Sequence, residues 1–350
     1  MTPLAALLIR RIAATGPITL ADYMAECLLH PAHGYYTTQT PFGTAGDFTT
    51  APEISQMYGE ILGLCLAQTW VDQGAPGRFT LAELGPGRGT LMADVLRATR
   101  GVPGFHAAAR VVLLEASPTM RTAQRSALGL HPACWIDRID QLADAPLYLL
   151  ANEFFDALPV RQFTREGSAW AETVVGVRGG ALTLGRADAA PLAMLAHRLA
   201  DTSPGDVVEV CPAAALIMAQ IGTLIAGQGG LALIADYGGW VSRGDTFQAM
   251  RAHAFTDPMA EPGHADLTAH VDFAALAQAA LPARCAYATM GAVLVALGMG
   301  KRAEVLAQGL SGTALQSLTA AYQRLTDPAE MGSVFKMLAV FAGEIPPGFA

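Results

Sequence analysis

The sequence predicts an α/β fold in which a mostly parallel, doubly wound sheet is covered by helices on both faces. Three observations predict it. Short apolar segments alternate with helical segments from residue 79 onward, the segment 147–151 is apolar throughout, and a glycine-rich turn joins the first apolar segment to a helix. Strands that alternate with helices form parallel sheets. A strand without polar residues is typical of the sheet centre, where both faces are buried.

The first 75 residues are expected to form a separate N-terminal helical segment with a long loop. Its first helix should end at Gly16-Pro17 and be amphipathic. The apolar face of this helix is expected to carry Leu4, Leu7, Leu8 and Ile12. Thr19 to Asp22 matches a capping box and predicts a second helix to about residue 29.

Residues 30–52 contain several glycines and prolines and are expected to form a loop, followed by a helix over 54–72. Such a long irregular stretch in a compact chain is usually functional. His30 and His33 lie three residues apart before the loop, but no acidic or cysteine partner is patterned with them. We therefore expect a structured lid at this place and no metal site.

Residues 76–350 are expected to form the sheet domain, with insertions at about 165–205 and 240–330. The expected strands are 79–84, 111–115, 134–137, 147–151, 207–210, 231–236, 285–289 and 335–341. The expected helices are 91–99, 118–128, 213–226, 273–280, 292–297, 302–309 and 313–325. Arg178-Gly179-Gly180 separates two further strands, 170–177 and 181–184, which should pair as a hairpin.

Composition and charge exclude several classes of protein. Hydrophobic residues make up 52% of the chain and charged residues 15%, which excludes a disordered chain. The longest uncharged apolar runs are about ten residues, whereas a membrane span needs roughly 20. A net charge of −8 disfavours nucleic acid as the partner, because the phosphate backbone binds basic surfaces. Five widely spaced cysteines argue against a disulfide framework or a zinc knuckle and fit a reducing compartment.

The turn from Glu83 to Thr90 is the main candidate for a ligand site. Its three glycines allow a tight turn and a close approach to the backbone, and the following helix offers free N–H groups. The dinucleotide fingerprint G-x-G-x-x-G fails, because Thr90 occupies the place of its third glycine. Glu83, two residues before Gly85, suits a ligand with an amino group and a sulfonium better than a pyrophosphate. The pattern is similar to motif I of class I S-adenosylmethionine (SAM) methyltransferases.

Two further acidic residues end the next strands. Glu115 lies 26 residues after Gly89, where a carboxylate can accept both hydroxyls of a ribose. Asp137 ends the third strand and is either a polar contact to adenine or a solvated strand end. The predicted cofactor-binding residues are Glu83, Gly85, Pro86, Gly87, Gly89, Thr90, Glu115 and Asp137.

Asn152, Glu153 and Asp156 follow the fourth strand, which in this class of fold ends near the transferred methyl group. An amide and two carboxylates there could hold a cationic acceptor or one with N–H groups. The alternative is a helix cap by Asn152, with Phe154 and Phe155 in the core. The run 236–239, after a later buried strand, has the same ambiguity.

Several long runs resemble the MidA-like family of SAM-dependent methyltransferases, and the similarity extends over essentially the whole chain. The runs are 30–36, 46–56, 83–92, 151–160, 230–238, 244–246, 266–273, 331–336 and 346–349. One departure is visible at 290–294, where the family is expected to have a glutamine before Gly291 and an aromatic residue after it. Met290 and Val293 stand there instead.

The resemblance implies a class I, Rossmann-like methyltransferase fold with a seven-stranded sheet, and SAM as the cofactor. Mitochondrial members are protein arginine methyltransferases in the assembly of respiratory complex I. The implied partner is a protein with an accessible arginine, such as a complex I-type subunit, in a bacterial cytoplasm or in the mitochondrial matrix of a eukaryote. An anionic clamp for this arginine is expected from the catalytic candidates Glu153, Asp156, Asn152, Glu53 and Asp47.

Three other functions stay open at this point. A small-molecule methyltransferase would need a deep, closed acceptor pocket instead of an open acidic groove. An assembly chaperone would bind SAM only for stability, although an intact glycine motif disfavours this. An NAD-dependent oxidoreductase is disfavoured by Thr90. The sequence is compatible with a homodimer but does not determine the oligomeric state.

Overall fold

The computed structural model describes residues 1–38 and 49–349. The chain forms two compact units, each assembled from three separate stretches of sequence. Unit 1 comprises Met1–Phe48, Asp156–Ala214 and Trp240–Asp272, and unit 2 comprises Thr49–Phe155, Ala215–Gly239 and Phe273–Ala350. The expected division of the chain at residue 75 stays a prediction.

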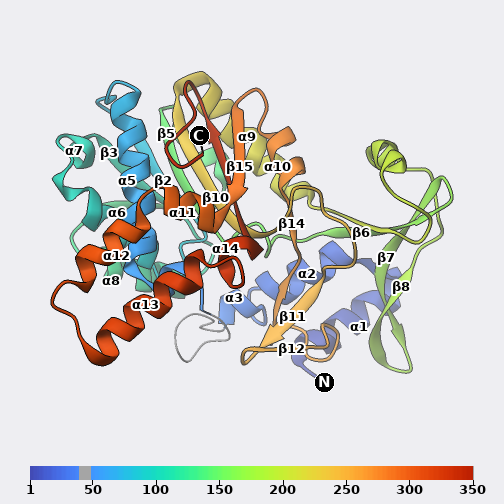
Figure 1. Cartoon of the computed structure of the whole chain (residues 1–350). Helices are drawn as coiled ribbons and strands as arrows, with labels where there is room; N and C mark the ends of the chain where they lie inside the picture. Colours follow the sequence, from blue (N-terminus) through green and yellow to red (C-terminus); the bar gives the residue numbers. More distant parts are fainter. Residues whose placement is uncertain (39–48, 350) are drawn as a thin grey trace. The chain divides into compact units, whose positions relative to one another are not determined.

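Seven strands of unit 2 form one mixed sheet in the order β15-β16-β10-β5-β2-β3-β4 (Figure 1). Five neighbouring strands, from β4 to β10, are parallel, whereas β16 is antiparallel to both of its neighbours. The bounds are β2 Phe79–Leu84, β3 Ala109–Leu114, β4 Ala133–Ile136, β5 Leu147–Asn152, β10 Gly230–Gly239, β15 Arg284–Thr289 and β16 Phe335–Phe341. The predicted α/β fold with a mostly parallel sheet is confirmed.

Strands β2 and β5 occupy the centre of this sheet. Every residue of β2 is buried, and so are all residues of β5 except Asn152. Four aromatic side chains pack together near the start of these strands, with ring centroids 4.9 to 5.9 Å apart: Trp70, Phe79, Phe105 and Tyr148. The order of strands along the chain reverses between β2 and β5. Ligands of such sheets bind beyond the carboxyl ends of the strands at this switch point.

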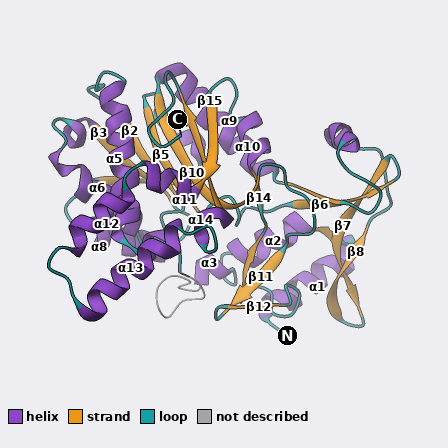
Figure 2. Cartoon of the chain, viewed as in Figure 1, coloured by secondary structure: helices purple, strands orange, loops and turns teal. Residues whose placement is uncertain are grey.

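Helices cover both sides of the sheet of unit 2. In Figures 1 and 2, α5 and α6 lie on one side of the strands and α9 and α10 on the other. The α-helices of this part are α4 Ala51–Ile54, α5 Gln56–Asp72, α6 Thr90–Ala98, α7 Phe105–Ala108, α8 Pro118–Leu128, α9 Pro212–Gln228 (in unit 2 from residue 215), α10 Phe273–Ala279, α11 Met290–Ala296, α12 Met299–Ala307, α13 Gly312–Thr326 and α14 Met331–Val334. Short 3-10 turns occur at Thr99–Gly101 and Ile139–Gln141.

The helix expected over 54–72 begins two residues later than predicted. Ser55 has an extended backbone, with φ of −159°, and its hydroxyl accepts a hydrogen bond from the backbone N–H of Met57 at 3.2 Å. This is the geometry of an N-cap, which separates α5 from the short helix α4.

Unit 1 combines helices with two antiparallel sheets. One sheet has the order β1-β7-β6-β9, with β8 paired to β7, and the other has the order β12-β11-β13. The helices are α1 Pro3–Thr15, α2 Leu20–Leu29, α3 Tyr35–Thr38 and the 3-10 helix η3 Ala193–Ala200. The strands are β1 Ile18–Thr19, β6 Arg161–Glu166, β7 Ala169–Arg178, β8 Ala181–Arg186, β9 Val207–Val210, β11 Gln248–Arg251, β12 Ala254–Thr256, β13 Asp266–Thr268 and β14 Val271–Asp272.

The two predicted helices at the start of unit 1 are present. α2 follows Thr19, whose hydroxyl accepts a hydrogen bond from the backbone N–H of Asp22 at 3.0 Å, as the capping box predicted. The prediction for Leu7 was wrong, since this side chain is 36% exposed while Ala5 is buried in its place. At 100° per residue, Leu7 projects about 110° from the centre of the stripe that the buried side chains form.

The strands of unit 1 confirm one prediction and correct another. β7 and β8 pair as the predicted hairpin, from Thr173 opposite Arg186 to Arg178 opposite Ala181. The segment 207–210 was predicted within the alternation of strands and helices, yet it pairs antiparallel with β6. Strand β6, Arg161–Glu166, was not predicted from the sequence.

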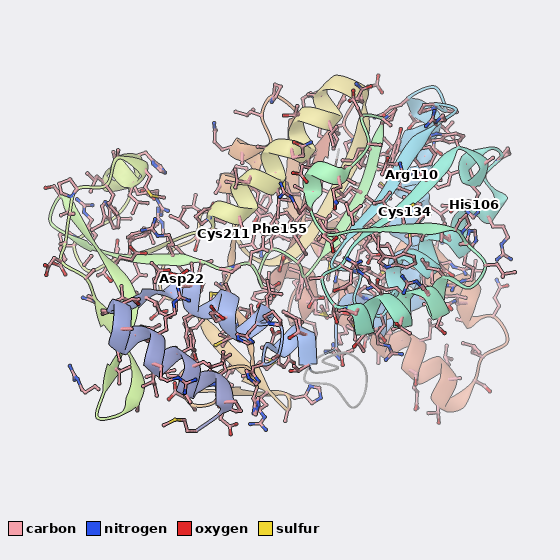
Figure 3. All side chains as sticks on the ribbon, turned by 180° about the vertical axis from the view of Figure 1, so that it is seen from behind. Asp22, His106, Arg110, Cys134, Phe155 and Cys211 are labelled. Carbon is pink, nitrogen blue, oxygen red and sulfur yellow. The ribbon has the colours of Figure 1, made fainter. Side chains whose placement is uncertain are left out.

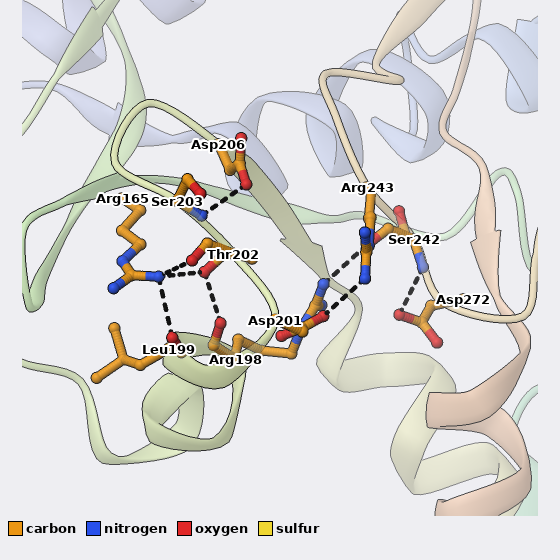
Figure 4. Close-up of polar contacts among 10 residues, drawn as sticks. All are labelled: Arg165, Arg198, Leu199, Asp201, Thr202, Ser203, Asp206, Ser242, Arg243 and Asp272. Atoms are coloured by element: carbon orange, nitrogen blue, oxygen red, sulfur yellow. Dashed lines mark hydrogen bonds and ion pairs between the residues drawn. The ribbon is translucent and has the colours of Figure 1, made fainter.

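A polar network joins η3 to a later segment of unit 1 (Figure 4). Arg198 is buried, and its Nε donates to Asp201 Oδ1 at 3.0 Å while its Nη2 donates to the backbone oxygen of Ser242 at 3.1 Å. Arg243 lies 3.6 Å from the same carboxylate, and Asp272 accepts from the backbone N–H of Ser242 at 3.0 Å. A buried guanidinium is stable only with such partners.

Within residues 1–38 and 49–349, no helix combines the length and the apolar character that a membrane crossing requires. The five cysteines are free thiols. Cys134 on β4, labelled in Figure 3, lies 3.8 Å from the guanidinium of Arg110 on the neighbouring strand β3.

Candidate active site

The glycine turn after β2 has a backbone that side chains would obstruct. Gly85, Gly87 and Gly89 have φ values of +59°, +51° and +86°, in the left-handed region that favours glycine. A Cβ atom on Gly85 would lie 2.8 Å from Cδ2 of Phe154, and one on Gly89 would lie 3.1 Å from Cα of Gln124. Helix α6 begins directly after Gly89, so its first backbone N–H groups face the turn. Glycine therefore lets the turn pack closely against Phe154 and Gln124 and leaves its backbone without side chains.

Glu83, near the end of β2, is buried next to this turn. Its side chain is 3% exposed, and within the described part of the chain no hydrogen-bond donor reaches its Oε2. Burial raises the pKa of its carboxyl from 4.5 to about 8, and the nearby Glu115 adds to the rise, whereas a hydrogen bond from the backbone of Met92 opposes it. A buried acceptor without a donor suits a ligand that brings its own N–H groups.

Glu115, which follows β3, is held by two hydrogen bonds. Its Oε1 accepts from the backbone N–H of Ser117 at 2.7 Å and its Oε2 from Gln124 Nε2 at 2.9 Å. Gln124 Nε2 also donates to the backbone oxygen of Gly87 at 2.8 Å, and Gln124 Oε1 accepts from the indole of Trp135 at 2.7 Å. The buried Gln124 thus connects the glycine turn to Glu115 and has a partner for each polar atom of its amide.

Asp137 follows β4 and is largely solvated, with 70% of its side chain exposed. Its Oδ1 lies 2.5 Å from Arg121 Nη2, and Arg121 Nε donates to the backbone oxygen of Glu115 at 2.9 Å. Arg121 therefore links the two strand ends at which the sequence predicted acidic contacts.

Asn152 and Glu153 at the end of β5 form a fixed pair of polar side chains. Asn152 Oδ1 accepts from the hydroxyl of Tyr58 at 2.6 Å, and its Nδ2 donates to Glu153 Oε1 at 2.9 Å. The backbone N–H of Ala51 donates to the same Oε1 at 3.2 Å. Glu153 has φ of +50°, and its own N–H donates to the backbone oxygen of Ala235 at 2.9 Å. A left-handed backbone is unusual for a residue other than glycine and often marks a functional site.

Tyr58 is fully buried near the start of α5. Burial raises its pKa well above the usual range, and the carboxylates of Glu153, Asp236 and Glu83 raise it further. Asp236 on β10 is itself buried and accepts from the backbone N–H of Phe155, which Figure 3 labels, at 3.0 Å. The hydroxyl of Tyr58 therefore stays protonated and serves as a donor.

Glu53 on α4 contacts the glycine turn. Its Oε1 accepts from the hydroxyl of Thr90 at 2.7 Å, and its Oε2 lies 4.0 Å from the guanidinium of Arg88. Two residues predicted for different tasks, Glu53 for the acceptor and Thr90 for the cofactor, thus lie in direct contact.

Two of the predicted clamp residues are not placed with this group. Asp47 lies outside the described residues. Asp156 belongs to unit 1, where it is buried near Tyr36. Burial raises the pKa of Tyr36, and the carboxylates of Asp266 and Asp156 raise it further, with the Tyr36 hydroxyl 2.7 Å from Asp266 Oδ1. A clamp that joins Asp156 to Glu153 stays a prediction.

The structure also describes the two histidines and the place where the chain departs from the expected family pattern. The rings of His30 and His33 stack with centroids 5.1 Å apart, and no group of three metal-ligating side chains occurs within 1–38 and 49–349. Met290 and Val293, the departure from the expected family pattern, are buried in the core of unit 2.

Comparison with known proteins shows the family to which the chain belongs. The family profile Methyltransf_28, described as "Putative S-adenosyl-L-methionine-dependent methyltransferase", matches residues 61–289. The chain belongs to this methyltransferase family.

Relatives and a solved structure cover nearly all of the methyltransferase. It is 35% identical to the mitochondrial protein arginine methyltransferase NDUFAF7 of Xenopus tropicalis, over 95% of this chain and 84% of that protein. The human protein of the same name is 34% identical, over 97% and 83%. A crystal structure of a COG1565 superfamily member from Burkholderia thailandensis, bound to S-adenosyl-homocysteine, is 28% identical with a TM-score of 0.83 and covers 99% of this chain and 94% of that chain.

The cofactor of this methyltransferase is SAM. The residues around the turn fit it, because SAM carries an ammonium and a sulfonium. These groups suit the buried carboxyl of Glu83, whose Oε2 has no donor among residues 1–38 and 49–349. Left-handed glycines allow the adenosyl part to approach the backbone. The resemblance to the methyltransferase family and the predicted cofactor are confirmed, and the NAD-dependent alternative is set aside.

Sequence reasoning missed two residues that contact the candidate site residues. Tyr58 lies in a helix of largely apolar residues and gave no pattern of its own. Gln124 left a signal, because it follows Met120 and precedes Leu128 by four residues, so that a polar side chain interrupts a buried helical stripe. A buried glutamine at such a position must find hydrogen-bond partners.

Proposed function

We propose that this methyltransferase transfers a methyl group from SAM to a guanidinium nitrogen of an arginine in a protein, as in a complex I-type respiratory subunit. The observation that carries the proposal is the carboxylate of Glu153, held by Asn152 and Ala51 at the end of β5. The names of the curated relatives, protein arginine methyltransferases, support it.

Each predicted cofactor-binding residue has a role in SAM binding in this proposal. Glu83 receives the cationic end of the cofactor, and Glu115 accepts the ribose hydroxyls. Gly85, Pro86, Gly87 and Gly89 supply bare backbone, and Thr90 keeps the turn attached to Glu53 through its hydroxyl. Asp137, which is exposed and paired with Arg121, borders the adenine.

An arginine acceptor needs a carboxylate in a fixed position. Its guanidinium stays charged at neutral pH, since its pKa exceeds 12, so the lone pair of the nitrogen is delocalised. SAM supplies an electrophilic methyl group when bound. Glu153 pairs with the guanidinium, orients one nitrogen and accepts the proton that this nitrogen loses. Correct positioning contributes several kcal/mol to such a transfer.

The experiment is incubation of the protein with methyl-labelled SAM and a lysate from cells that lack it, followed by mass spectrometry of the labelled band. We expect label on an arginine, and its loss in Glu153→Gln with SAM binding retained. Glu304→Gln is the matched control, because it removes an exposed carboxylate on α12 that pairs with Lys301. Unchanged transfer by Glu153→Gln would remove Glu153 from the reaction.

The same experiment separates the two remaining alternatives. Label in small molecules and not in protein would indicate a small-molecule methyltransferase. SAM binding without any transfer would indicate an assembly chaperone. A reducing bacterial or mitochondrial compartment and a homodimer remain predictions.

A further inference from the structure

A chain of hydrogen bonds connects the interior of α5 to the carboxylate at the end of β5. The hydroxyl of Tyr58 lies 2.6 Å from Asn152 Oδ1, and Asn152 Nδ2 lies 2.9 Å from Glu153 Oε1. Tyr58 is fully buried. The packing around α5 sets the position of this hydroxyl. Because the hydroxyl is buried, it must make a hydrogen bond there.

The direction of these bonds fixes the orientation of the amide. A protonated phenol donates, whereas a carboxylate only accepts. Asn152 must therefore turn its oxygen to Tyr58 and its Nδ2 to Glu153. The opposite orientation would place the amide oxygen against a carboxylate oxygen, where both are acceptors, so each neighbour selects the same orientation.

The position of the Glu153 side chain depends on this orientation of the Asn152 amide. Its left-handed backbone, with φ of +50°, is unfavourable for a residue with a side chain and is maintained by its surroundings. Both hydrogen bonds described above, from Asn152 and from Ala51, end on the same oxygen. Loss of the amide donor would remove the shorter of these two bonds and leave the longer one, of 3.2 Å, from Ala51.

We propose that Tyr58 is a positioning residue for methyl transfer, which orients the Asn152 amide so that it holds the carboxylate of Glu153 ready for the acceptor. The role of Glu153 rests on the proposed function, whereas the action of Tyr58 on Asn152 does not. Tyr58 itself does not take part in the chemistry.

The side-chain amide of Asn152 can be observed selectively, because Asn152 is the only asparagine of the sequence. Labelling with 15N-asparagine gives one side-chain amide nitrogen, with signals from its two protons, in the full-length protein. Tyr58→Phe removes only the hydroxyl. The matched control is Tyr148→Phe, which removes an equally buried hydroxyl that donates to Gln73 Oε1 at 2.8 Å near the other end of β5.

In Tyr58→Phe we expect the two amide protons of Asn152 to change their chemical shifts and to exchange faster with water. Tyr148→Phe should leave this signal unchanged even if it lowers the melting temperature as much. An Asn152 signal that is the same in Tyr58→Phe and in the wild type would overturn the proposal, whatever the acceptor is.

The second measurement is the initial rate of label transfer from SAM into the lysate of cells that lack the protein. We expect Tyr58→Phe to lower this rate by about 10- to 100-fold, as small misplacements of a reacting group do. SAM affinity by calorimetry should not change. In an Asn152→Ala background, Tyr58→Phe should cause no further loss, because both changes break one chain of bonds.

Two results would refute the role in transfer: a rate that Tyr58→Phe leaves unchanged, or losses that multiply in the double variant. If the wild type labels no arginine, the proposed function fails. The amide signal then still decides whether Tyr58 orients Asn152, so the two failures are distinguishable.

Discussion

SAM binding should expel a proton from Glu83. This carboxyl is buried, and burial raises its pKa to about 8 in the protein without cofactor. At pH 7 it is therefore roughly nine-tenths protonated. A cation that approaches Oε2 favours the ionised carboxylate and so lowers this pKa. Binding at pH 7 should release nearly one proton from this group.

The magnitude follows from this linkage. If the bound carboxyl is ionised throughout, the affinity for SAM should rise roughly 50-fold between pH 6 and pH 8 and level off above that range. Calorimetry in phosphate and in Tris at pH 7 measures the proton directly, since the two buffers differ in ionisation enthalpy. In Glu83→Gln, which cannot ionise, affinity should be lower at pH 8 and the pH dependence should largely disappear.

The same pKa determines how the stability of the cofactor-free protein changes with pH. A carboxyl that holds its proton more tightly in the folded state stabilises the protein below pH 4.5, and this contribution is lost as the pH rises through 8. The loss reaches about 4 kcal/mol of the free energy of unfolding at pH 8. Two results would refute the role of Glu83 in SAM binding: equal heats of SAM binding in phosphate and in Tris, or a pH dependence of SAM affinity that persists in Glu83→Gln.

Two further predictions concern the residues around the cofactor. Gly85→Ala should lower the free energy of unfolding, measured in urea, by about 1–3 kcal/mol more than Gly167→Ala. Both glycines have φ near +60°, but only a Cβ atom at Gly85 would collide with Phe154. Equal losses would mean that the backbone angle alone matters. Gln124→Leu should weaken SAM binding about 10-fold by calorimetry, because Glu115 and the glycine turn lose a shared donor; unchanged affinity would contradict this.

The sequence predicted those parts of the molecule in which local chemistry and position agree. The capping box at Thr19 starts α2, and the apolar run after residue 78 becomes β2 with the predicted bounds. The glycine turn and Glu115 lie together because parallel strands end at one edge of a sheet. These features depend only on neighbours in the chain or on the common direction of the strands.

Contacts between distant segments were beyond the reach of the sequence. β9 has the composition of a sheet strand, and nothing local indicates that its partner is β6 in unit 1. The bond between Tyr58 and Asn152 joins residues 94 positions apart. Tyr58 lies in a helix of largely apolar residues, and which polar group its hydroxyl meets depends on how α5 packs against the sheet.

The position of β16 has a consequence for biosynthesis. It is the last of the seven strands to leave the ribosome, yet it lies between β10 and β15. These two strands pair with β16 and not with each other. Until residue 341 has emerged, a nascent chain must keep β10 as an open, apolar edge, on which other chains can pair. Premature stops between codons 331 and 341 would therefore yield aggregation-prone products, although every candidate active-site residue had already been translated.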